Sequence, residues 1–148
     1  WLSNLNFIRD LPTILEGISE AISTTRSLMM ITEHVRTRLA RQLSNANANE
    51  FGVIPLVTLS PEWEHAFAES IIGEGDERQL AMAPTALQGF ITKVRNVLED
   101  KGETAVLLTS PAIRPFVRSI IERFRPLTVV MSQNEIHPKA KIKTVGQI

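Results

Sequence analysis

The feature that most constrains the fold of this chain is a phrase that occurs twice, fifty residues apart. Each copy has an apolar run typical of a β-strand, then Ser-Pro, and then a helix-like segment that carries Phe-x-x-Ser-Ile-Ile. The copies span residues 57–72 and 107–121. Because a strand that leads into a helix is the unit of layered α/β structures, the phrase predicts a sheet covered by helices in the C-terminal two-thirds of the chain.

The serine of each copy, Ser60 and Ser110, is interpreted as a helix N-cap with proline at the first helical position. The alternative is a pair of phosphate sites at helix N-termini, as in a small phosphate-ligand-binding α/β enzyme domain. Neither copy has the Gly-rich loop or the Lys-Ser/Thr pair of a phosphate cradle, and neither serine lies in Gly-x-Ser-x-Gly. We therefore predict that the chain is not an enzyme and has no catalytic residues.

The composition limits the kinds of binding and catalytic sites that the chain can hold. The chain has no cysteine, which excludes disulfides, thiolate zinc sites and thiol catalysis. Its three histidines, His34, His65 and His137, belong to no recognised ligand motif, so we predict no metal and no cofactor. The formal net charge is zero, which gives no overall basic field for nucleic acid.

Charge is nevertheless spread unevenly. Residues 50–77 hold seven acids and no Lys or Arg, whereas residues from 101 onward hold eight Lys or Arg and three acids. One interpretation is that these charges lie on ordinary solvated faces of the protein. The other is that an acidic face of one copy meets a basic face of a neighbouring copy. RNA binding by a basic surface between Arg114 and Lys143 is a minor alternative, which predicts strongly salt-dependent binding.

The N-terminal part predicts two helices. Asp10 can cap the first, which has Pro12 in its first turn, and Ser27 can cap a second that continues to Leu43. Such a helical hairpin is too small to bury a good core alone, so it must pack on another part of the protein. Three arginines of the second helix fall off its apolar stripe: Arg36, Arg38 and Arg41.

The polar run of residues 44–49 marks a boundary, so we predict a helical subdomain at 1–48 and an α/β subdomain at 49–148. The second has the order β-α-α-β-α-β-β and a mixed four-stranded sheet, which gives an α+β (α/β) fold. Pro55 lacks an N–H to donate to a neighbouring strand, so we expect the first strand to lie at an edge of the sheet or to begin after the proline. The strands at 104–109 and 127–132 should be parallel, and the last strand, 140–148, should form a hairpin with its predecessor.

Several segments resemble the FlhA family of flagellar and type III secretion export-gate proteins. In the N-terminal part these are residues 8–16 (IRDLPTILE), 32–36 (TEHVR) and 39–41 (LAR). In the C-terminal part they are 106–111 (VLLTSP), 113–118 (IRPFVR) and 129–136 (VVMSQNEI). The segments are ordered and spaced as in the family, and the resemblance covers residues 7–148. It implies the third and fourth cytosolic subdomains of an export-gate protein.

The resemblance implies a function in ring assembly, in reception of substrates and chaperones, and in export switching, through protein–protein contacts. The partners expected are further copies in a homo-oligomeric ring, other export-apparatus proteins, export substrates and chaperones, and no nucleic acid. It places the protein at the cytoplasmic face of the bacterial inner membrane, anchored by a segment absent from this chain. In the family the third subdomain supplies much of the ring contact, so Arg36, Arg38 and Arg41 are the candidate interface residues.

Overall fold

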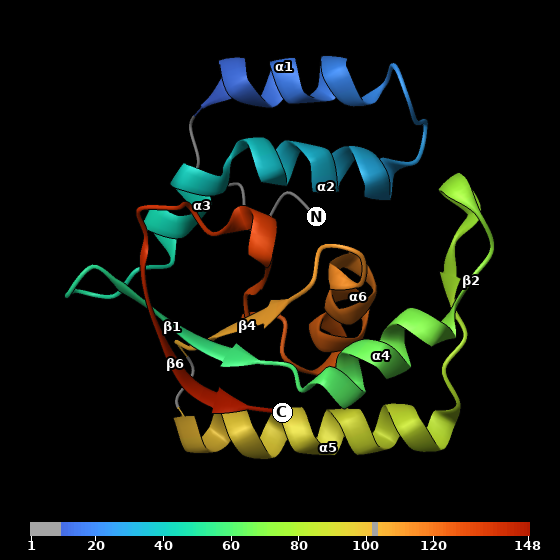
Figure 1. The fold of residues 1–148 in the computed structure, drawn as a ribbon, viewed down its shortest axis with the longest axis vertical. Helices are drawn as coiled ribbons and strands as arrows, with labels where there is room; N and C mark the ends of the chain where they lie inside the picture. Colours follow the sequence, from blue (N-terminus) through green and yellow to red (C-terminus); the bar gives the residue numbers. More distant parts are fainter. Residues whose placement is uncertain (1–9, 102–103) are drawn as a thin grey trace.

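The computed structural model describes residues 10–101 and 104–148, and forms three layers (Figure 1). One layer holds α1 (Leu11–Ala21), α2 (Leu28–Arg38) and α3 (Ala40–Ala46), and another holds α4 (Pro61–Ser70), α5 (Pro84–Lys101) and α6 (Arg114–Phe124). A four-stranded sheet lies between them. The apolar spacing from Pro84 onward predicts a helix that closes near Gly102. Gly102 and the first two residues of the segment at 8–16 lie outside the described residues.

The sheet has the order β5-β4-β1-β6, formed by β1 (Val53–Thr58), β4 (Val106–Thr109), β5 (Val130–Ser132) and β6 (Lys141–Gln147). Every pairing in it is parallel. The α+β fold class is confirmed, and so is the parallel β4-α6-β5 unit. The predictions of a mixed sheet and of a terminal hairpin are wrong, because β6 pairs with β1 and not with β5.

The path of the chain between β5 and β6 explains why β6 pairs with β1. After Ser132 the chain forms the short 3₁₀ helix η3 (Gln133–Glu135) beneath α2 and α3 and then runs to the amino end of β1. The Ser44 hydroxyl of α3 holds this path, since it donates to the carbonyl of Glu135 at 2.9 Å and accepts from the N–H of His137 at 2.9 Å. A tight turn to an antiparallel strand is therefore replaced by a crossover.

Pro55 did not place β1 at an edge. The strand is central, but its pairing with β4 begins only at Leu56, one residue after the proline. Pro55 pairs in register with Lys143 of β6 on the other side. A missing N–H is tolerated here because the β4 ladder has not yet started at that position.

The two faces of the sheet bury separate apolar clusters. Alternate residues of β1 divide between them, with Ile54 and Leu56 beneath the helices α2 and α3 and Val57 facing α4, α5 and α6. The first cluster also contains Val35, Leu39 and Leu43, so the helical hairpin completes its core on the sheet. The polar run at 44–49 ends α3 and leads into the turn before β1.

Three local predictions need correction. The second helix does not run unbroken to Leu43, because it ends at Arg38 and Leu39 separates it from α3. Helix α4 ends at Ser70, and the next residues form a two-stranded antiparallel sheet of β2 (Ile71–Ile72) and β3 (Gln79–Leu80), which the sequence analysis missed. Ile72, which the repeated phrase places at the end of a helix, lies in β2 and is 54% exposed.

The two Ser-Pro sequences also differ in structure. Ser60 caps α4, since its Oγ accepts from the N–H of Trp63 at 3.4 Å. Helix α6 begins only at Arg114, so the prediction that Ser110 caps it is wrong. An α-helix that started at Pro111 would need an N–H at Pro115 to bond to the Pro111 carbonyl, and proline has none.

Ser110 instead holds Glu64 of α4. Its N–H and its Oγ–H both donate to the Glu64 carboxylate, at 2.9 and 2.8 Å. We predict that Ser110→Ala and Glu64→Ala are not additive in free energy of unfolding, with a coupling of about 1 kcal/mol, measured by urea denaturation of the two single variants and the double variant.

Ser119→Ala supplies the matched control for this coupling. The Ser119 hydroxyl donates within its own helix to the Phe116 carbonyl, so its effect should add to that of Glu64→Ala. Additive effects for the Ser110 and Glu64 pair would contradict the contact.

Candidate functional site

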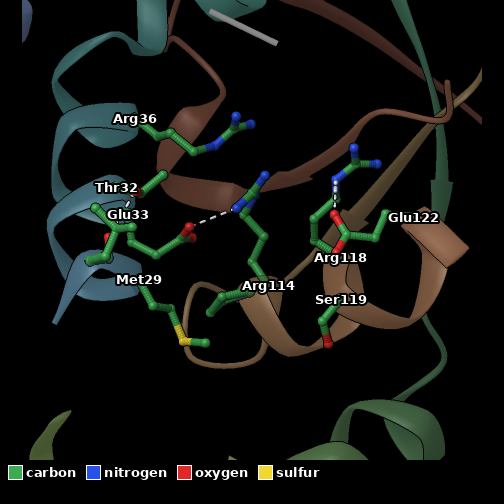
Figure 2. Close-up of a pocket in the computed structure, with 10 residues that line it drawn as sticks. Met29, Thr32, Glu33, Arg36, Arg114, Arg118, Ser119 and Glu122 are labelled. Carbon is green, nitrogen blue, oxygen red and sulfur yellow. Dashed lines mark hydrogen bonds and ion pairs between the residues drawn. The ribbon is translucent and has the colours of Figure 1, made fainter. Parts of the chain in front are cut away.

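A cluster of four charged side chains lies between the α1–α3 layer and the sheet. Glu33 and Arg36 stand about one turn apart on α2, Arg114 is the first residue of α6, and Glu135 belongs to η3. Figure 2 shows Glu33 and Arg114 pointing toward each other from α2 and α6. Two acids and two bases are thus enclosed by three elements that are distant in the sequence.

The centre of this cluster is the pair of Arg36 and Glu135, whose side chains are 2% and 1% exposed. The Arg36 Nε donates to one carboxylate oxygen at 3.1 Å and its Nη2 donates to the other at 3.0 Å. The Ser132 N–H also donates to Glu135, at 3.3 Å. This two-point geometry satisfies the fork of the guanidinium, as burial of such a pair requires.

Arg114 joins the pair to Glu33. Its Nη1 donates to Glu33 at 2.6 Å, and its Nε lies 3.6 Å from the Glu135 carboxylate. Arg36 and Arg114 both donate to the carbonyl oxygen of Val130 in β5, at 3.3 and 2.9 Å. Across residues 10–101 and 104–148, no buried side-chain N or O atom lacks a hydrogen-bond partner.

Burial shifts the pKa of two members of this cluster, Glu33 and Arg114. Loss of water raises the pKa of Glu33 above its ordinary 4.5, and the positive charge of Arg114 opposes that rise in part. Burial likewise lowers the pKa of Arg114, and the neighbouring Arg36 lowers it further. Both directions follow from the cost of holding charge away from solvent.

A hollow of about 390 Å³ opens beside the cluster, between α2 and α6. Glu33, Arg36 and Arg114 line its inner part, and Leu28 and Met29 line its edge with partly exposed apolar side chains. Arg118 and Glu122 of α6 complete it (Figure 2). Among the described residues, each charged side chain that lines the hollow has a partner of opposite charge, which leaves a small ligand little to pair with.

The structure does not bring the three predicted interface arginines together. Arg36 is buried, so the interpretation that it lies off the apolar stripe is wrong. Arg38 is partly exposed and pairs with Glu16 and Glu20 of α1 at 3.3 and 3.6 Å. Arg41 is exposed on α3.

The basic C-terminal surface is also smaller than its sequence indicates. Arg114 is internal, and Arg118 donates from within the fold to the carbonyls of Thr128 and Pro126, at 3.0 and 3.4 Å. Arg114 and Arg118, on which the RNA-binding alternative depends, are therefore already bonded to backbone carbonyls of the protein. In the same way, Glu64 occupies both donors of Ser110, which the phosphate-ligand alternative would need.

Sequence analysis missed Glu135, the acid on which the cluster depends. One signal was available, since Ser132 and Glu135 have the Ser-x-x-Glu spacing of a capping box. Within the described residues, no three His, Asp or Glu side chains are close enough to hold a metal ion. No helix in the same part of the chain has the length and apolar character to cross a membrane.

Removal of Arg36 should be strongly destabilising because it leaves Glu135 buried without its partner. We predict that Arg36→Ala lowers the free energy of unfolding by about 3–5 kcal/mol, whereas exposed Arg41→Ala changes it by less than about 0.5 kcal/mol. The double variant Arg36→Met with Glu135→Leu should recover most of the loss, because it removes both charges. Urea denaturation measures all three, and equal effects of Arg36→Ala and Arg41→Ala would contradict the burial of Arg36.

Glu33 should make stability depend on pH in a defined direction. Its raised pKa means that the unfolded chain releases this proton first as the pH rises. The stability due to the neutral carboxyl is therefore present below 4.5 and is lost between 4.5 and the raised pKa. We predict that the free energy of unfolding of the wild type minus that of Glu33→Gln falls over this window, as measured by urea denaturation at a series of pH values. A difference that stays constant with pH would contradict it.

Comparisons with known proteins agree on one family. The FHIPEP family model matches residues 2–141. The flagellar biosynthesis protein FlhA of Caulobacter vibrioides is 59% identical over 144 residues, which cover 95% of this chain and 21% of that protein. The chain thus spans about a fifth of the length of that relative.

Solved structures give the same result. The Chlamydia pneumoniae CdsV protein matches with a TM-score of 0.86 and 31% identity, over 95% of this chain and 41% of that one, and CdsV has also been solved in complex with CdsO. Nonameric SctV-C from EPEC matches with a TM-score of 0.82 and 25% identity, over 95% and 43% of the two chains. The family is one of secretion proteins and is not known as an enzyme family. The chain therefore belongs to the FHIPEP family, with the fold of the C-terminal domains of flagellar FlhA and type III secretion export-gate proteins.

Proposed function

We propose that this chain is part of the cytosolic region of a protein-export gate and acts through protein–protein contacts in a homo-oligomeric ring. The observation that carries the proposal is its similarity over 95% of its length to SctV-C, which was solved as a nonamer. Family membership supports the export function, and the paired charges of the hollow beside the buried cluster favour contact over chemistry.

The proposal extends to partners and location. By its resemblance to the family, the full protein would receive export substrates and chaperones and take part in switching between substrate classes, at the cytoplasmic face of the bacterial inner membrane. The complex of CdsV with CdsO supports contact with other export-apparatus proteins. Membrane anchorage would come from a part of the protein outside this chain.

We assign the three candidate arginines different roles, and their exposure and contacts support the assignment. Arg41 and Arg38 have exposed or partly exposed side chains on the outer helices, so they are the proposed ring-contact residues. Arg36 is a positioning residue, because its bond to Glu135 fixes α2 on the loop between β5 and β6. The ring contact would therefore rest on a helical layer that is held rigidly to the sheet.

Charge reversal tests this assignment in the complete cytosolic region of the full-length protein. We predict that Arg41→Glu, alone or with Arg38→Glu, raises the concentration needed for ring formation at least about tenfold, because a contact that attracts becomes one that repels. Mass photometry across a concentration series measures the fraction of rings.

Arg123→Glu is the matched control for this experiment, since Arg123 is exposed on α6, on the opposite layer. Unfolding midpoints should be compared for all variants, because Arg38 also pairs with Glu16 and Glu20 of α1. Unchanged ring formation in a folded Arg41→Glu variant would refute the role of Arg41.

A further inference from the structure

Strand β6 forms an exposed edge of the four-stranded sheet. It stands last in the strand order, and it is seven residues long, against three for β5 at the other edge. Its first four residues, Lys141–Thr144, are all exposed. Because β6 pairs with β1 on one side only, alternate backbone N–H and C=O groups point away from the sheet, as in any edge strand.

The two faces of this edge differ in chemistry. The parallel register places Lys141 beside Val53 and Lys143 beside Pro55, so the two lysines share one face. Ile142 pairs with Ile54, whose side chain belongs to the cluster beneath α2 and α3, and it therefore lies on the other face. A strand added beside β6 would meet positive charge on one face and an apolar side chain on the other.

A hydrogen-bonded turn presents a second apolar group near the start of this edge. Phe51 is 77% exposed, in the turn that leads into β1. Asn49 holds this turn, since its side-chain oxygen accepts from the N–H groups of Phe51 and Val53, at 2.9 and 3.0 Å. Val53 is the partner of Lys141 in register, so Phe51 lies close to the beginning of the β6 edge.

The lysines of this region have no ion-pair partner among the described residues. Lys139, Lys141 and Lys143 are exposed, and none lies within 4.0 Å of a carboxylate in residues 10–101 and 104–148. Lysines on an edge strand commonly serve to block pairing with other chains. Protection alone does not account for Ile142, which is 52% exposed between two of them, or for Phe51.

We propose that the β6 edge binds an extended acidic segment of a partner protein as an added strand. Carboxylates at alternate positions of that segment would pair with Lys141 and Lys143, and the apolar residues between them would cover Ile142 and extend toward Phe51. Backbone hydrogen bonds would provide affinity, and the alternation of charge would select the segment. This surface lies on the sheet and does not depend on the ring contact proposed for Arg38 and Arg41.

The test uses the full chain and a fluorescent probe peptide of alternating Glu and Val, about six residues long to match β6. Fluorescence anisotropy should show saturable binding that weakens as salt rises, because the contact is in part electrostatic. The double variant Lys141→Glu with Lys143→Glu should bind at least about tenfold more weakly. Lys93→Glu is the matched control, since Lys93 is exposed on α5, and its binding should stay within about twofold of the wild type.

Two further probes separate strand addition from simple charge attraction. A peptide of the same composition with its three Glu followed by its three Val should bind at least about fivefold more weakly, because the alternation is lost. The alternating peptide with alternate amides N-methylated should also bind at least about fivefold more weakly, because backbone donors are lost. Equal binding of all three peptides overturns strand addition.

Other occupants of the edge give different results. Absence of saturable peptide binding by the wild-type chain overturns the proposal. Binding to phosphatidylserine vesicles that requires Lys141 and Lys143, without peptide binding, would assign the surface to a membrane instead. Self-association that the same lysine substitutions abolish, as seen by sedimentation, would assign it to a second copy of the chain.

Discussion

The ion pair of Arg36 and Glu135 is the constraint on which the arrangement of layers depends. Two charges removed from water cost several kcal/mol each, and only close, two-point geometry offsets that cost. The pair therefore fixes α2 against the segment after β5. Arg114 and Glu33 extend the same requirement to α6, so helices of both layers are held to the sheet by one network.

Much of the fold followed from local rules. Asp10 and Ser27 cap α1 and α2 as predicted, and the periodic apolar residues of 84–101 form one long helix. The parallel β4-α6-β5 unit followed from its strand–helix–strand order. Each of these features depends on residues that are close in sequence, where capping and periodicity are informative.

Two of the predictions that were wrong concern features that long-range contacts determine. The position of β6 beside β1 requires the path of residues 133–140, which Ser44 and Arg36 direct from a distance. The prediction that Arg36 lies on the surface was wrong for the same reason. Arg36 sits at a helix position that spacing alone assigns to the surface, and its burial becomes possible only because Glu135 folds back beneath α2.

The same segment also joins the two proposed contact surfaces. Residues 133–137 are held by Arg36 and Ser44 of the helical layer, and the chain enters β6 four residues later, at Lys141. A shift of α2 relative to the sheet would disturb the buried ion pair, and a shift of α3 would disturb the hydrogen bonds of Ser44. Since breaking that pair would leave two buried charges without their two-point contact, movement of the segment together with the helices is the less costly response.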